Sequence, residues 1–140
     1  MSDIYLGNPN LKKVNTPQEF TKEHIEEFLK CKKDPVYFTE KHIKIVNVDE
    51  GLVSFDMYKF QKKLIRNFHK NRFNICKMPR QTGKSTTVVS YLLHYAIFND
   101  NVNIGILANK AATARDLLGR LQLAYENLPT WMQQGIIAWN

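Results

Sequence analysis

The sequence is poor in cysteine and has no long uninterrupted apolar run. Its 140 residues contain two cysteines, Cys31 and Cys76, which are too few for a disulfide framework and favour a reducing, intracellular protein. No apolar run approaches the roughly 20 residues that a membrane-spanning helix needs. Residues 1–10 lack the charged and then apolar pattern of a signal peptide. We therefore expect a protein that is neither secreted nor embedded in a membrane.

Repeats and low-complexity segments are also absent, and the composition is that of a globular chain, 44% hydrophobic and 24% charged. The formal net charge of +7 is unevenly distributed. Residues 51–80 carry eight Lys and Arg against one Asp, whereas residues 1–50 carry eight basic against nine acidic residues and residues 81–140 carry four against three. The basic excess thus falls on one stretch, which indicates a local anionic partner, a nucleotide or a nucleic acid.

Residues 1–55 predict a small, mainly helical region. Its clearest signals are the ordered charges over 21–33, acidic first and basic last, and the N-cap pair Asp34-Pro35. Both patterns are typical of helices. The expected elements are an irregular arm over 1–15, a turn or short helix from Thr16, helices over 21–33 and 35–42, and a hairpin or two extended pieces over 43–48 and 52–55.

Residues 56–140 alternate between helical and strand-like patterns, which predicts an α/β fold with a parallel sheet. The segment 85–99 contains no Asp, Glu, Lys or Arg and is apolar around most of its circumference, as in a buried helix. Residues 102–108 have the near-continuous apolar character of a parallel strand. The expected elements are helices over 57–70, 85–99 and 110–128, strands over 73–78 and 102–108, and a candidate strand over 136–139. Ile75 and Cys76 are expected in the core.

The predicted helix 57–70 is strongly amphipathic. Opposite its apolar face lie Lys59, Lys62, Lys63, Arg66 and Lys70. Such a face is usually solvated, and its alternative role is contact with nucleic acid. Gln61 lies near the centre of the apolar face, either as a glutamine bonded to backbone at the edge of the core or as a residue that faces adenine, whose edge offers both donor and acceptor atoms.

Gly83-Lys84-Ser85 stands between a predicted strand and a predicted helix, the context that a phosphate-binding loop requires. In such a loop, backbone N–H groups at a helix N-terminus surround the phosphate oxygens. The lysine neutralises the β and γ phosphates, and the following hydroxyl holds Mg²⁺. Lys84 and Ser85 are therefore candidate ligands of ATP and Mg²⁺.

The loop departs from the pattern G-x-x-x-x-G-K-[ST], because Met78 occupies the position of the first glycine. Pro79 and Arg80 must form the turn. An arginine at this place brings a permanently charged fork near the γ-phosphate, the role of an arginine finger supplied in cis. The alternative is a surface arginine paired with an acid elsewhere.

Several stretches resemble the large terminase subunit of T-even-like tailed bacteriophages, and the resemblance extends from about residue 8 onward. Those that carry it are Lys30-Cys31-Lys32, Asp34-Pro35-Val36-Tyr37-Phe38, Phe60-Gln61, Met78-Pro79-Arg80-Gln81-Thr82-Gly83-Lys84-Ser85-Thr86, Gly105-Ile106-Leu107-Ala108-Asn109-Lys110 and the stretch 128–140. The resemblance implies a P-loop NTPase-type parallel sheet of the RecA/helicase-like kind. It also implies an ATPase that drives double-stranded viral DNA into the procapsid in the host cytoplasm.

The resemblance also assigns roles. Arg80 becomes the cis-acting trigger and, with Lys84, a catalytic residue, whereas Phe60-Gln61 becomes the adenine motif, in which Phe60 replaces the usual tyrosine. Gln81, Thr82, Gly83 and Thr86 complete the nucleotide site, with Ser85 on Mg²⁺. The implied partners are the portal protein, the small terminase subunit and, in a homo-oligomeric ring, further copies of the subunit.

Members of this family are several times longer than this chain. The expectation is therefore the first part of an ATPase domain, without the Walker B acidic pair or the nuclease domain, and inactive by itself. Two other interpretations remain open. One is a helicase-like, nucleic-acid-dependent ATPase, which also places a glutamine-bearing helix before its phosphate loop. The other is a non-catalytic DNA-binding or assembly module that uses the basic face of helix 57–70.

Overall fold

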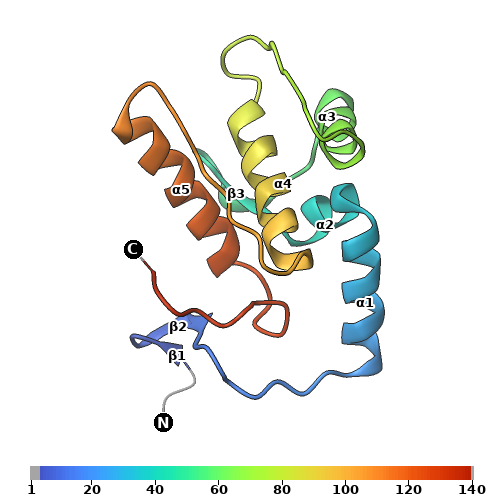
Figure 1. The fold of residues 1–140 in the computed structure, drawn as a ribbon, viewed down its shortest axis with the longest axis vertical. Helices are drawn as coiled ribbons and strands as arrows, with labels where there is room; N and C mark the ends of the chain where they lie inside the picture. The colour runs from blue at the N-terminus through green and yellow to red at the C-terminus, as the bar shows by residue number, and fades with distance from the viewer. Residues whose placement is uncertain (1–3, 140) are drawn as a thin grey trace.

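Helices are the main regular elements of the protein in the computed structural model, which describes residues 4–139 (Figure 1). Helix α4 lies between α3 and α5, and the two ends of the described chain lie on one side of the molecule. The helices are α1 (Lys22–Lys33), α2 (Pro35–His42), α3 (Lys59–Lys70), α4 (Lys84–Phe98) and α5 (Ala111–Glu126). The strands are β1 (Ile4–Tyr5), β2 (Asn8–Lys12), β3 (Lys44–Asn47) and β4 (Gly51–Ser54).

Side-chain caps explain where α1 and α2 begin. The hydroxyl of Thr21 accepts a hydrogen bond from the backbone N–H of His24 at 3.2 Å, and the carboxylate of Asp34 accepts one from the N–H of Val36 at 2.9 Å. Each bond satisfies a backbone donor that has no partner within the helix. Both predicted helices are confirmed, as is the hairpin of β3 and β4.

The core forms where α4 meets α2 and α3. Phe38, Ile65 and Leu93 supply fully buried side chains from these three helices. The ring of Phe38 packs edge-on against those of His94 and Phe98. The predicted burial of the uncharged helix is thus confirmed for the face of α4 that packs on these helices.

Residues 12–14, which follow the first hairpin, pair with Ile136 near the other end of the described chain. An antiparallel pair, β1 and β2, replaces the irregular arm that the sequence predicts. The N–H of Ile136 donates to the carbonyl oxygen of Lys12 at 2.9 Å, and the N–H of Val14 donates to that of Ile136 at 3.1 Å. Residues 16–20 contain no helix, and the candidate strand 136–139 is reduced to a single bridge between Ile136 and Lys13.

The predicted parallel sheet is wrong. Within residues 4–139 the strands form two sheets of two strands each, β1 with β2 and β3 with β4, and both pairs are antiparallel. Residues 73–78 and 102–108 belong to neither sheet. The molecule is therefore a small mixed α/β domain and not a P-loop NTPase-type parallel sheet of the RecA/helicase-like kind.

The error has a physical cause. An apolar, β-branched segment favours extended backbone and burial, but a strand also needs a hydrogen-bonded neighbour. The side chains of Phe73 and Ile75 are 83% and 100% exposed, and Cys76 is also exposed, so the expected core positions of Ile75 and Cys76 are wrong. The local pattern does not specify pairing.

Among the described residues, no helix is both long enough and apolar enough to cross a membrane.

Candidate functional site: the loop before helix α4

The loop that precedes α4 turns through two left-handed residues. Gln81 and Gly83 have φ angles of 59° and 70°, and Gly83 is the N-cap of α4. The hydroxyl of Thr82 donates to the carbonyl oxygen of Pro79 at 3.1 Å, which closes the turn on itself. The turn therefore forms without the glycine that Met78 replaces.

Lys84 lies over this turn. Its Nζ donates to the carbonyl oxygen of Met78 at 3.4 Å, a long and therefore weak bond. Lys84 is the first residue of α4, and the first four N–H groups of a helix have no partner within the helix. The ammonium group and these N–H groups give the mouth of the loop a positive potential, which suits an anionic ligand.

Gln61 connects α3 to the loop. Its Nε2 donates to the carbonyl oxygen of Thr82 at 3.2 Å, and its Oε1 accepts from the N–H of Tyr58 at 2.9 Å. The residue is 3% exposed, so this contact is part of the protein interior. The structure thus brings Gln61 to the loop, as the proposed adenine motif requires, but it engages both ends of the amide with the protein's own backbone.

Two exposed rings lie beside Gln61. Tyr58 and Phe60 stack with their ring centroids 5.7 Å apart and an angle of 9° between their planes. They are 70% and 44% exposed, so both rings are open to solvent. The sequence interpretation singled out Phe60 and missed Tyr58, although the aromatic pair two residues apart at the start of a predicted helix was a usable signal.

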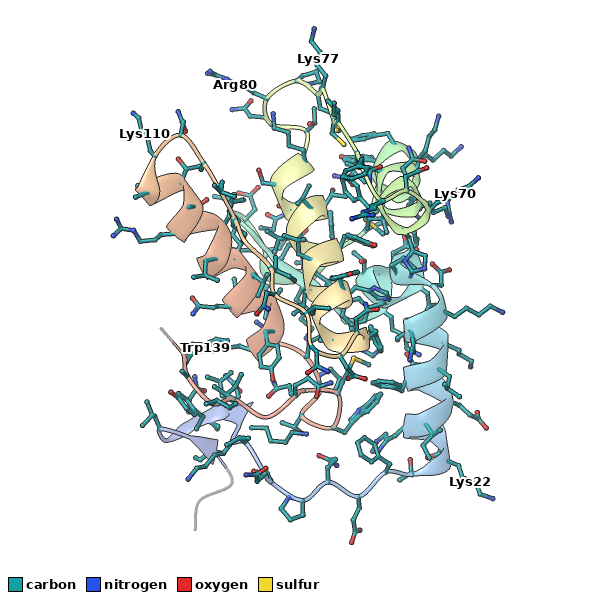
Figure 2. The ribbon with its side chains drawn as sticks, viewed as in Figure 1. Lys22, Lys70, Lys77, Arg80, Lys110 and Trp139 are labelled. Carbon is teal, nitrogen blue, oxygen red and sulfur yellow. The ribbon has the colours of Figure 1, made fainter. Side chains whose placement is uncertain are left out.

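The other predicted ligand residues of the loop differ in their exposure to solvent. Arg80 is exposed and extends outward from the loop, as does Lys77 (Figure 2). Ser85 and Thr86 are half-buried in the first turn of α4. Ser85 and Lys84 line a cavity of about 220 Å³, which Cys76 and Ile106 close from the two irregular segments. The loop is therefore flanked by the segments that the sequence assigned to the sheet.

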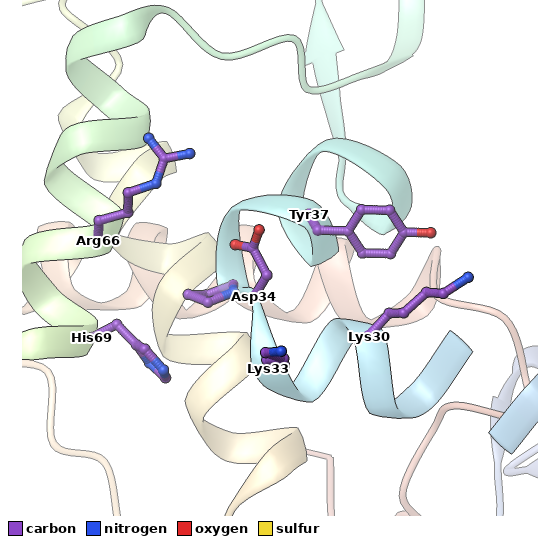
Figure 3. A pocket seen from close by; sticks show the side chains of 7 residues that line it. Lys30, Lys33, Asp34, Tyr37, Arg66 and His69 are labelled. Atoms are coloured by element: carbon purple, nitrogen blue, oxygen red, sulfur yellow. The ribbon is translucent and has the colours of Figure 1, made fainter. Parts of the chain in front are cut away.

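The basic side chains of α3 lie outside the loop and have different surroundings. Lys62 pairs with Glu40 at 2.5 Å, so its charge is compensated. Arg66 and His69 line a surface pocket of about 580 Å³ that α1 and α2 complete (Figure 3). The residues that line it are Lys30, Lys33, Asp34, Pro35, Tyr37, Arg66 and His69.

This pocket carries three cations against one carboxylate, because Lys30 and Lys33 in the last turn of α1 line it together with Arg66 of α3 and Asp34 (Figure 3). The order of charges over 21–33 predicts these lysines as partners of the helix dipole, and their proximity to α3 becomes visible only in the folded chain. Lys59, Lys63 and Lys70 lie on the exposed surface of α3. A comparison of the chain with protein-family models finds no match.

Proposed function

We propose that this chain binds the triphosphate of ATP with Mg²⁺ at residues 78–86, as the nucleotide-binding part of a phage DNA-packaging ATPase. One observation carries the proposal: a self-bonded turn with two left-handed residues leads into helix α4, and Lys84, its first residue and the one charged residue in it, lies over the turn. This is a local arrangement for an anion, and it does not depend on a parallel sheet. The resemblance to large terminase subunits supports the choice of ATP.

Lys84 and Ser85 take the central roles. Because the bond from Lys84 to Met78 is long, the ammonium group can exchange that carbonyl oxygen for a phosphate oxygen at little cost. The hydroxyl of Ser85, in the first turn of α4, would hold Mg²⁺. When bound, Mg²⁺ neutralises charge on the phosphates.

The aromatic pair supplies the site for the base. Exposed rings stack on nucleobases with little dependence on sequence, since every base has a π face. Phe60 and Tyr58 are adjacent to Gln61, which is bonded to the loop, so a base on these rings lies near the phosphates. Gln61 positions the loop in this proposal. Arg80, which extends outward in this structure, would have to turn inward to reach the γ-phosphate.

Calorimetry with Mg-ATP tests the proposal. The unmodified chain should bind Mg-ATP, and Lys84→Ala should lower the affinity at least about tenfold. The control Lys77→Ala should keep the affinity of the unmodified chain, since Lys77 is an exposed lysine of the segment that enters the loop. Phe60→Ala should weaken ATP but leave inorganic triphosphate unaffected. Equal affinity in Lys84→Ala and the unmodified chain would contradict the assignment.

A second function is favoured by the pocket in Figure 3. Lys30, Lys33 and Arg66 line the same pocket without an ion pair to Asp34 in the described residues, and such a cluster suits the phosphates of DNA. Binding of duplex DNA should weaken steeply with salt and should decrease in Lys33→Ala. If DNA binding persists in Lys84→Ala while ATP binding is absent from every variant and from the unmodified chain, the non-catalytic module is the better description.

A further inference from the structure

Three side chains that commonly bind metals meet between α1 and α2. Glu27 and Cys31 are one helical turn apart on α1, so they lie on the same face, and His42 ends α2. The Oε1 atom of Glu27 lies 2.8 Å from Nε2 of His42 and 3.6 Å from Sγ of Cys31. The three potential ligand atoms all lie within 4.8 Å of one another.

This cluster is largely withdrawn from solvent. Cys31 is fully buried, and the side chains of His42 and Glu27 are 9% and 15% exposed. Exposed side chains bind metals weakly because water competes for the ion. A buried set of ligands loses less binding free energy to this competition. The remaining exposure at Glu27 gives an entry path for an ion.

The other carboxylate oxygen of Glu27 is held from outside the cluster. The hydroxyl of Tyr37 donates to Oε2 at 3.0 Å, and Nζ of Lys41 donates to the same atom at 2.9 Å. These two bonds fix the carboxylate so that Oε1 faces Sγ and Nε2. Metal-binding carboxylates are usually oriented by bonds of this kind.

We propose that Glu27, Cys31 and His42 bind Zn²⁺ through Oε1, Sγ and Nε2, with water as the fourth ligand. One sulfur, one nitrogen and one oxygen donor form a set that Zn²⁺ accepts. Tetrahedral bonds of about 2.0–2.3 Å place ligand atoms roughly 3.3–3.8 Å apart. The contact between Sγ and Oε1 already fits, and the contact between Oε1 and Nε2 must open by about half an ångström.

Binding requires that both Sγ of Cys31 and Nε2 of His42 give up a proton. Nε2 donates to Oε1 of Glu27 in the metal-free protein, so its proton moves to Nδ1 or leaves to solvent before the nitrogen can bind the metal. The thiol proton of Cys31 leaves to solvent as the Zn–S bond forms. In the metal-free protein, burial and the neighbouring charge of Glu27 raise the pKa of Cys31 to about 12, so the sulfur is a thiol at neutral pH. The charges of the thiolate and the carboxylate then balance that of Zn²⁺, and the ion joins the C-terminal turns of α1 and α2. The site is independent of the proposed nucleotide loop.

Titration of the metal-free protein with Co²⁺ tests the proposal, because a thiolate bound to Co²⁺ gives a near-ultraviolet charge-transfer band. We expect this band to saturate at one Co²⁺ per chain and to disappear when Zn²⁺ is added. Cys31→Ser should lose the band, and Cys76→Ser should keep it, since Cys76 is the exposed cysteine. His42→Gln should weaken Zn²⁺ at least about tenfold in competition with a chromogenic chelator.

Circular dichroism of each variant shows whether it is folded. If Cys31→Ser does not fold, His42→Gln decides, and full Zn²⁺ affinity in that variant would overturn the site. The proposal also fails if the unmodified protein gives no charge-transfer band, or if the band is lost in Cys76→Ser and kept in Cys31→Ser.

Discussion

The side-chain amide of Gln61 joins helix α3 to the loop before α4, since its Nε2 donates to the carbonyl oxygen of Thr82 while its Oε1 accepts from the N–H of Tyr58. The two bonds satisfy the amide inside the protein, where an unpaired polar group would be costly. The shape of the loop therefore depends on a residue 21 positions earlier in the chain.

Gln61→Ala should destabilise the protein and loosen the loop. The substitution leaves the N–H of Tyr58 and the carbonyl oxygen of Thr82 without their partner, at a cost of about 1–3 kcal/mol in the free energy of unfolding. Urea unfolding measures the cost, and calorimetry with Mg-ATP measures the accompanying loss of affinity. Gln18→Ala is the control, because Gln18 is a half-buried glutamine that makes one solvent-exposed bond, to the backbone of its neighbour Glu19. Equal stability of the two variants would show that the bonds to Tyr58 and Thr82 contribute nothing.

Gly83→Ala should be harmful for two separable reasons. The φ angle of 70° costs a residue with a Cβ atom roughly 1 kcal/mol, and the new Cβ would lie 2.6 Å from Nε2 of Gln61. Introducing Gly83→Ala into the Gln61→Ala background removes the second cost and leaves the first, so the two effects should not add.

The matched control for this glycine is Gly119→Ala in α5. A Cβ at Gly119 meets no atom within 4 Å, and alanine favours a helix by about 1 kcal/mol relative to glycine. This variant should therefore be more stable than the unmodified protein in thermal unfolding. A stabilising Gly83→Ala would show that the left-handed turn is not required.

Gln133→Ala should separate the two ends of the chain. The buried amide of Gln133 donates to the carbonyl oxygen of Asn10 at 2.8 Å and of Leu128 at 3.2 Å, and accepts from the N–H of Lys12 at 3.1 Å. Its loss should cost about 2–3 kcal/mol and accelerate amide exchange in β2. Gln134→Ala, which removes one bond to Ile97, should cost less. The reverse order would contradict this role.

The sequence predicts the helices well because their signals are local. The caps at Thr21 and Asp34 and the uncharged run of α4 lie within the elements that they specify. The prediction of a parallel sheet was wrong because strand pairing depends on a neighbour that is distant in the sequence. Phe73 and Ile75 have the pattern of a buried strand but are exposed. The division of the chain at residues 55 and 56 stays a prediction.

The candidate site shows the same limit. Lys84 and Ser85 could be found because the motif and the helix start are contiguous in the sequence. The contact from Gln61 to Thr82 and the pocket that Lys30 and Arg66 both line depend on how helices pack. Glu27 and His42 are 15 residues apart and carry no shared motif, so their proximity appears only in three dimensions.

His94 should make stability depend on pH. The residue is 2% exposed, and its Nε2 donates to the carbonyl oxygen of Cys31 at 2.9 Å. Within residues 4–139, its Nδ1 is a buried atom without a hydrogen-bond partner. Burial lowers the pKa of His94 from 6.5 to about 4, although the bond to Cys31 acts in the opposite direction.

The direction of the pH effect follows from this lowered pKa. Between pH 6.5 and 4 the unfolded chain binds a proton at His94 that the folded protein does not bind, so the free energy of unfolding should decrease as the pH falls through this range, by up to about 3 kcal/mol. Urea unfolding at a series of pH values measures the decrease. The variant His94→Gln can keep the bond to Cys31 but cannot titrate, so its stability should decline less between pH 6.5 and 4.5. The control is His24→Gln, which replaces a partly exposed histidine and should show the same decline as the unmodified protein. An identical decline in His94→Gln and the unmodified protein would show that His94 is not the group responsible.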